Sequence, residues 1–170
     1  MRGYNSAPED HLFHKGDWFA TAQAQKQKLV QEIEGQNGNE LLNTSTTDLA
    51  QHYASKFTID VPVIYPDDLV VDQRETQVDV SHQRDRYFSD RSGPHYVAGT
   101  SVDVDVPFTG DGNAFHIQPT TQNFNNPRAR IGNGHLHFSI AGTGLTADRV
   151  KADIDSRISA INQHLTWQTS

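Results

Sequence analysis

The sequence of 170 residues contains no cysteine, so it can form no disulfide, has no thiol nucleophile and cannot hold zinc through thiolates. A chain without cysteine fits a reducing compartment, and a cytoplasmic location is expected. The sequence also lacks any apolar run near the roughly 18 residues that span a bilayer, and its first residues do not resemble a signal peptide. A soluble protein without a membrane partner is therefore expected.

Basic residues are also scarce. The chain has 14 Lys and Arg against 21 Asp and Glu, for a net charge of -7, which disfavours non-specific binding to nucleic-acid phosphates. A restriction-type magnesium site needs strand carboxylates with a lysine close by, and no lysine follows a strand acid by two residues. The lysines are Lys15, Lys26, Lys28, Lys56 and Lys151. Catalysis by these residues alone is not expected.

What the chain does contain is a set of alternating segments that predict strands. Residues 96–108 place apolar side chains at one parity and polar side chains at the other, and residues 135–140 repeat this pattern. A shorter alternation over 114–118 predicts a third strand, and further strands are expected over 69–72 and 76–81. The result is a sheet with one apolar face.

Helix signals flank these strands. Asp17 is placed to cap a helix through about residue 34, and Ser45 with Asp48 forms a capping box that opens a helix over about 46–56. The clearest helix follows Thr146. Its apolar stripe recurs every three or four residues at Val150, Ile154, Ile158, Ile161 and Leu165.

An apolar sheet face needs helices to cover it, so these elements predict one α+β domain over residues 1–170. In that domain, a mostly antiparallel sheet of about five or six strands packs against N-terminal helices and one long C-terminal helix. Residues 1–15 are polar and mixed, and they are expected to form a tail that can be disordered.

Several short runs carry a resemblance to known sequences. They are Val106–Asp111, Phe115, Pro119–Thr121, Asn126–Ala129, Gly134–Phe138 and Ile158–Gln168. Through them the chain after about Trp18 resembles the amino-terminal accessory region of uncharacterised bacterial proteins that carry a restriction-endonuclease-like domain in their C-terminal half. The resemblance implies a restriction-like phage-defence context, with the nuclease chemistry in a linked domain. It carries over no functional residue.

Two loops offer residues for contact with a partner, at 82–94 and 119–130. Arginines near aromatic residues suit phosphates and unstacked bases, although Asp85 and Asp90 dilute the first cluster. The candidate contact residues are Arg84, Arg86, Tyr87, Phe88, Arg91, Asn123, Arg128 and Arg130. Together with the resemblance, these loops suggest a non-catalytic sensing, recognition or regulatory domain of a bacterial defence-type nuclease, which acts through protein or nucleic-acid contact without a cofactor. Its possible partners are a linked nuclease domain, nucleic acid (DNA binding) or a second copy of the chain.

The alternative is a histidine-rich module that binds a divalent metal, or an enzyme that depends on one. His135 and His137 project from the same strand face, a spacing found in metal sites, and other ligands can lie on neighbouring strands. The candidate ligands are His116, His135, His137, Asp103 and Asp105. Against this, polar residues that alternate along an antiparallel strand commonly face water.

Overall fold

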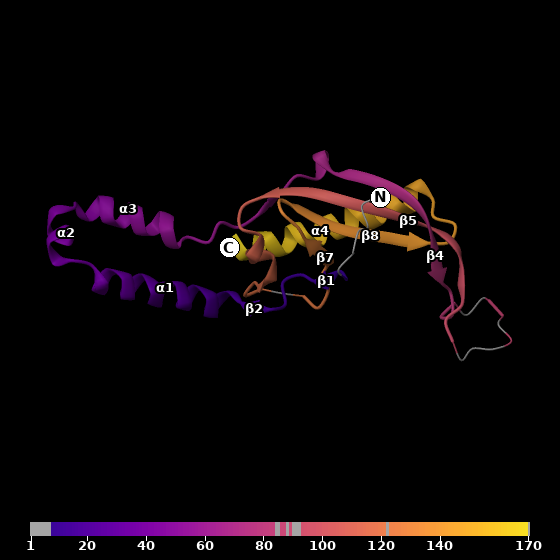
Figure 1. Cartoon of the computed structure of the whole chain (residues 1–170), viewed down its shortest axis with the longest axis horizontal. Helices are drawn as coiled ribbons and strands as arrows, with labels where there is room; N and C mark the ends of the chain where they lie inside the picture. The colour runs from indigo at the N-terminus through magenta and orange to yellow at the C-terminus, as the bar shows by residue number, and fades with distance from the viewer. Residues whose placement is uncertain (1–7, 84–85, 88, 90–92, 122, 170) are drawn as a thin grey trace.

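Strand β5 (Tyr96–Thr109) is the longest described strand of the sheet in the computed structural model, which describes residues 8–83, 86–87, 89, 93–121 and 123–169 (Figure 1). Strand β4 (Val70–Asp79) pairs antiparallel with one edge of β5 along its whole length. Strand β8 (His135–Gly142) pairs antiparallel with the other edge. The segments expected at 69–72 and 76–81 are therefore parts of one continuous strand.

Three shorter strands complete the sheet. β7 (Arg128–Ile131) pairs with β8, and β1 (Asp10–His11) pairs with β7. β3 (Val63–Ile64) pairs with the C-terminal end of β5. The short 3-10 helix η1 (Pro66–Asp68) then connects β3 to β4. The described residues thus form a six-stranded sheet, as the sequence pattern predicted.

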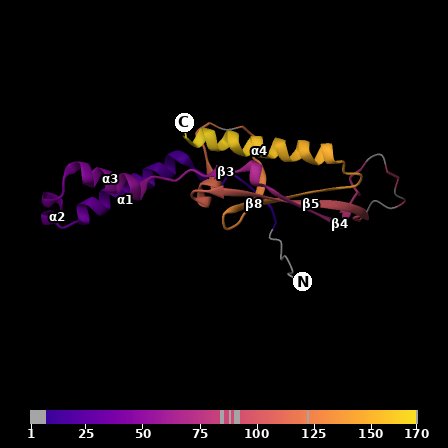
Figure 2. The same cartoon turned by 90° about the horizontal axis from the view of Figure 1, so that it is seen from above.

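Helix α4 (Ala147–Thr169) lies along one face of the sheet (Figure 2). Thr146 caps it, because the Thr146 hydroxyl accepts a hydrogen bond from the Arg149 amide at 3.3 Å. The predicted stripe faces the sheet, since Ile154, Ile158, Ile161 and Leu165 are all buried. Beneath it lie the even-numbered residues of β5 and β8: Val102, Val104, Val106, Leu136, Phe138 and Ile140. The α+β class and the long C-terminal helix are confirmed.

The segment before α1 adds to this core. Leu12 and Phe13, which lie within the expected polar tail, are 1% and 0% exposed. The Leu12 amide donates to the Pro127 carbonyl at 2.8 Å, and the Phe13 amide donates to the Phe115 carbonyl at 2.6 Å. Two apolar residues among polar ones show no periodicity, so the burial of this segment depends on contacts with residues distant in sequence.

Three helices project from the sheet as an arm, α1 (Trp18–Gly35), α2 (Gly38–Asn43) and α3 (Thr46–Phe57) (Figure 1). Asp17 accepts from the Ala20 amide at 3.1 Å, and Ser45 accepts from the Asp48 amide at 3.1 Å, so both predicted caps are present. The arm meets the rest of the chain near β2 (Gly16–Asp17) and β6 (Ile117–Gln118), which pair in parallel. No helix in the described ranges is long and apolar enough to cross a membrane.

One expected strand is wrong. Residues 112–116 form a 3-10 helix, η2 (Gly112–His116), and only Ile117 and Gln118 are extended. The Asp111 side chain accepts from the Asn113 amide at 2.9 Å, and its carbonyl accepts from the Ala114 amide at 3.0 Å. These local hydrogen bonds turn the chain where alternation alone predicted an extended run.

Candidate functional site

Strand β4 is an open edge of the sheet. One side of β4 is paired with β5, and no described strand pairs with the other side. Nor does the backbone of 70–79 have a hydrogen bond outside the β4–β5 ladder in the described part of the chain. A free edge presents a row of unpaired amide and carbonyl groups, which is a template for another strand. β4 offers this template over ten residues.

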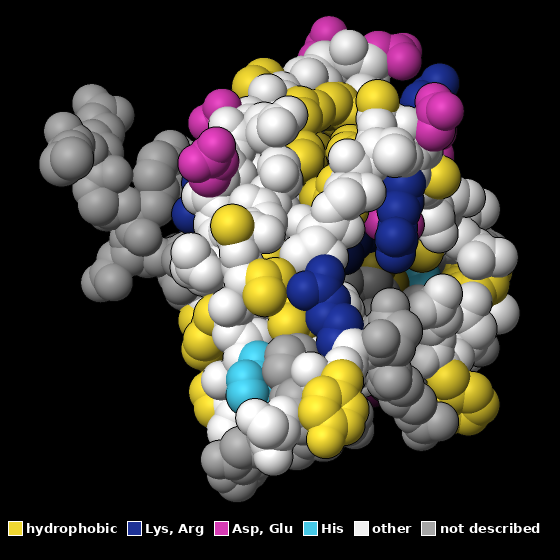
Figure 3. Space-filling view, turned by 90° about the vertical axis from the view of Figure 1, so that its right-hand side faces the viewer, with side chains coloured by type: hydrophobic (Ala, Val, Ile, Leu, Met, Phe, Trp, Pro, Cys, Tyr) yellow, Lys and Arg dark blue, Asp and Glu magenta, His cyan; other side chains and the backbone are white. Residues whose placement is uncertain are grey.

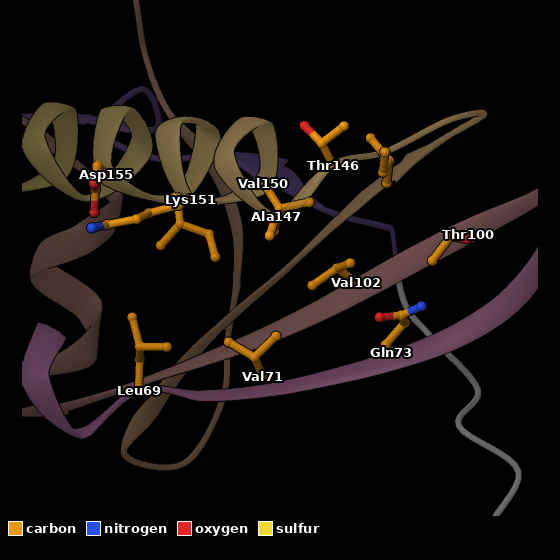
Figure 4. Close-up of a pocket in the computed structure, with 12 residues that line it drawn as sticks. Leu69, Val71, Gln73, Thr100, Val102, Thr146, Ala147, Val150, Lys151 and Asp155 are labelled. Carbon is orange, nitrogen blue, oxygen red and sulfur yellow. The ribbon is translucent and has the colours of Figure 1, made fainter.

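An apolar groove runs beside this edge, between α4 and the sheet (Figure 4). Its volume is about 460 Å³. The groove exists because α4 lies over β5 and β8, whose even-numbered residues are buried, while β4 contributes none of the buried core. Val71 shows the result, since it points to the α4 side and is still 47% exposed. The apolar lining consists of Leu69, Val71, Val102, Leu145, Ala147, Val150 and Ile154.

Polar side chains stand at the two ends of the groove. Lys151 and Asp155 extend from α4 at one end, and Gln73, Thr100 and Thr146 lie toward the other (Figure 4). Lys151 forms no ion pair with any residue that the structure describes. Apolar walls with a few polar groups at fixed places are typical of binding sites.

The same combination is visible from the end of the molecule. Apolar side chains gather in a hollow near the top of this view, with acidic and basic side chains on either side of it (Figure 3). Side chains of an added strand alternate between the two faces of the sheet. A segment that pairs with β4 would therefore direct every second side chain toward α4.

The opposite face of the sheet is polar and internally bonded. The Asp103 carboxylate accepts from the Ser139 hydroxyl at 2.5 Å and from Arg74 Nε at 2.8 Å. Burial disfavours the charged form of Asp103, but the hydrogen bonds from Ser139 and Arg74 outweigh it, so the pKa of this carboxyl is lowered from 3.8. Next to this group, His137 Nδ1 lies 2.7 Å from Asp105 Oδ1. These carboxylates are committed to neighbours within the sheet.

The five candidate metal ligands are not brought together. His135, His137, Asp103 and Asp105 share the polar face, but the His135 ring turns to its own chain, with Nδ1 3.3 Å from the Asn133 carbonyl. His116 stands apart in η2, where burial, and then the nearby charge of Lys15, lower its pKa from 6.5. Within the described ranges, no three His, Asp or Glu residues form a group that could hold a metal.

The predicted contact residues fall in two separate regions. Arg84, Phe88 and Arg91 lie outside the described residues. Arg86 and Tyr87 stand between β4 and β5, and the Tyr87 side chain is 92% exposed. These positions adjoin the Tyr96 end of β5, whereas Arg130 lies opposite His137, which lies opposite Asp105. Tyr96 and Asp105 are about 30 Å apart along β5, at about 3.3 Å per residue.

The second region is partly bonded within the chain. The Arg128 guanidinium donates to the Glu9 carbonyl at 3.2 Å, and the Asn123 side chain accepts from the Asn125 amide at 3.2 Å. Arg130 pairs across from His137 in the sheet. The two predicted clusters therefore do not form one basic surface.

Sequence reasoning missed the groove residues of β4 and α4. Val70 and Val71 adjoin an alternating polar run, which indicates a strand, but the sequence does not show which strand stands at the edge. Lys151 and Asp155 are charged residues outside the apolar stripe of α4, so the sequence placed them on the solvent-exposed side of the helix. The sequence did indicate the apolar stripe of α4, and the stripe of one helix covers fewer strands than the sheet contains.

Comparisons with known proteins add no relative. No family model matches the chain, and no curated protein or solved structure matches it. The fold and the site define an α+β domain with an open strand edge beside an apolar groove.

Proposed function

We propose that this chain is a non-catalytic recognition domain that contacts another protein by accepting an extended segment along β4. The observation that carries the proposal is the coincidence of an unpaired ten-residue strand edge with an apolar groove on its α4 side. In strand addition, main-chain hydrogen bonds supply affinity, and pockets for alternate side chains supply specificity. The edge supports the first requirement and the groove the second.

The groove chemistry indicates what the segment contains. Its apolar walls take aliphatic or aromatic side chains at alternate positions, about 7 Å apart. An acidic side chain in the segment can pair with Lys151, which has no ion-pair partner in the described chain. We therefore expect an extended segment with alternating apolar residues and an acidic residue toward the Lys151 end.

Protein contact is favoured over nucleic-acid contact. The net charge is -7, and the two arginine regions are about 30 Å apart along β5. Arg128 also donates to Glu9 within the chain. The resemblance to regions that precede a restriction-endonuclease-like domain supports one particular setting, in which the domain positions or regulates a nuclease of bacterial defence type.

Two adjacent valines provide the test. Val71 faces the groove and Val70 faces the other side of β4, and both are exposed, at 47% and 61%. A display library of linear peptides is selected against the wild-type chain, and the affinity of selected peptides is measured for Val71→Arg and for Val70→Arg. Loss of one buried apolar contact is worth about 1.5–3 kcal/mol, so Val71→Arg should weaken binding by roughly 10- to 100-fold. Val70→Arg should leave it nearly unchanged.

Hydrogen exchange locates the peptide independently. Peptide binding should slow the exchange of β4 amides that face the open edge, because they become hydrogen-bonded. Equal loss of affinity in both arginine variants, or peptides that protect the arm and leave β4 unprotected, would refute the proposal.

A further inference from the structure

We propose that the open edge also accepts β4 of a second copy, so that two chains join through an antiparallel β4–β4 pair centred on Gln73. This inference uses the same edge as the proposed function, yet it requires no partner peptide. The dimer would place α4 of both copies on the same side of one continuous sheet.

The symmetry of such a pair restricts its register. Two identical sheet edges join about a two-fold axis perpendicular to the sheet. This axis runs midway between one residue and the same residue of the second copy, which lie opposite each other. Every other residue pairs reciprocally with its mirror position around that centre. The choice of register is therefore a choice of the central residue within β4.

Charge selects among the possible centres. Like charges directly opposite each other destabilise a sheet, whereas opposite charges stabilise it. Centres at Asp72, Arg74 or Glu75 would each set a charge against its own copy. A centre at Gln77 would oppose Glu75 to Asp79.

A centre at Gln73 instead places opposite charges across from each other. Around it, Asp72 of each chain lies opposite Arg74 of the other, so the pair contributes two reciprocal ion pairs. The overlap then covers residues 70–76, which lie within β4. A centre at Thr76 also avoids repulsion, but it forms no ion pair between the copies.

The same register also brings opposite charges together on the α4 side of the sheet. Val71 would lie opposite Glu75 of the second copy, on the face that points to the groove. Lys151 lines the groove together with Val71 and has no ion pair within the described chain. Glu75 of the second copy therefore supplies an acidic group on the groove side, where Lys151 has no ion-pair partner among the described residues. Self-association and binding of a partner segment would exclude each other.

A single cysteine tests the register, because the chain has none of its own. In Gln73→Cys the two thiols lie on opposite residues whose Cα atoms are about 4.5–5.5 Å apart, which suits a disulfide. Gln77→Cys is the matched control, since Gln77 is also exposed and on the same face of β4. Its two copies would stand about 26 Å apart. Mild oxidation should yield a covalent dimer with Gln73→Cys and monomer with Gln77→Cys.

Charge reversal tests the pairing without a disulfide. Asp72→Arg alone sets arginines against each other, and Arg74→Asp alone sets aspartates against each other, so each variant should sediment as a monomer. When the two variants are mixed, both arginines of the first lie opposite aspartates of the second, and a heterodimer should form. Arg74→Asp also removes the bond to Asp103, and recovery of the dimer on mixing shows that the fold survives.

The outcomes separate this inference from the proposed function. Equal cross-linking of both cysteine variants, or a wild-type chain that stays monomeric at every concentration in sedimentation, would overturn the β4–β4 dimer. Peptide binding by a monomeric chain would leave the proposed function intact. A Gln73-centred dimer in a chain that selects no peptide would support the dimer and remove partner recognition.

Discussion

His164 gives a direct test of how the core beneath α4 is held. Its side chain is fully buried, and its ring stacks on Phe13 with the centroids 4.8 Å apart and an interplanar angle of 12°. His164 Nδ1 donates to the Ala160 carbonyl at 2.8 Å, because a carbonyl can only accept, and this places the ring hydrogen on Nδ1. His164 Nε2 is then an acceptor, buried without a hydrogen-bond partner among the described residues.

Two substitutions separate the contribution of the ring from that of the unpaired nitrogen. An unsatisfied buried acceptor costs roughly 1–3 kcal/mol, and a slightly larger ring costs roughly 1–3 kcal/mol in overpacking. His164→Phe keeps the stack and removes the unpaired acceptor, but it adds volume and loses the Nδ1 hydrogen bond to the Ala160 carbonyl, which is worth about 0.5–1.5 kcal/mol. It should therefore be about 1 kcal/mol less stable than the wild type. His164→Ala leaves a cavity and should cost about 3 kcal/mol. For a domain of this size that corresponds to a fall in Tm of roughly 6–12 °C.

Urea unfolding of the three proteins measures both differences, with unchanged m-values showing that the unfolding transition is comparable. If His164→Phe loses as much stability as His164→Ala, the argument fails, because a ring stacked on Phe13 would then give no advantage over a cavity. A large gain with Phe would instead mean that the site has room for the larger ring.

Two further predictions concern pH and backbone conformation. Burial lowers the pKa of His116 from 6.5, so the unfolded chain binds the proton more readily and stability should fall as the pH drops from 6.5 through the folded-state pKa. His116→Gln should flatten this part of a urea-midpoint profile between pH 7 and pH 5, and an unchanged slope would assign it to another group. Gly110 has φ +94°, and an added Cβ would lie 2.9 Å from Pro62 Cα, so Gly110→Ala should cost about 2 kcal/mol or more. Gly134 has φ +77° with open space around it, so Gly134→Ala should cost about 1 kcal/mol, and equal melting temperatures for the two variants would contradict the steric argument.

Patterns with a short period were the part of the fold that sequence could predict. Leu136 and Phe138 are fully buried and Ile158 is 8% exposed, as their spacing in a strand and a helix required. The caps at Asp17 and Ser45 are present for the same reason, because a cap depends on residues only a few positions apart. Where local hydrogen bonds competed with alternation, as at Asp111, the prediction of a strand failed.

The candidate site was less predictable, because it depends on the order of the strands. The spacing of His135 and His137 placed both on one strand face, but it did not show that His137 would bond Asp105 while His116 stood apart in η2. Nor did it show that Leu12 and Phe13 would enter the core. These contacts join residues that are distant in the chain.

The sequence by itself determined which side of each strand and helix is apolar, because side-chain direction repeats every two residues in a strand and every 3.6 in a helix. Only the tertiary structure decided that β4 is an edge strand and that α4 covers β5 and β8 while leaving Val71 exposed. The physical reason is that strand pairing and helix placement are set by long-range packing. The open edge and its groove arise from that packing.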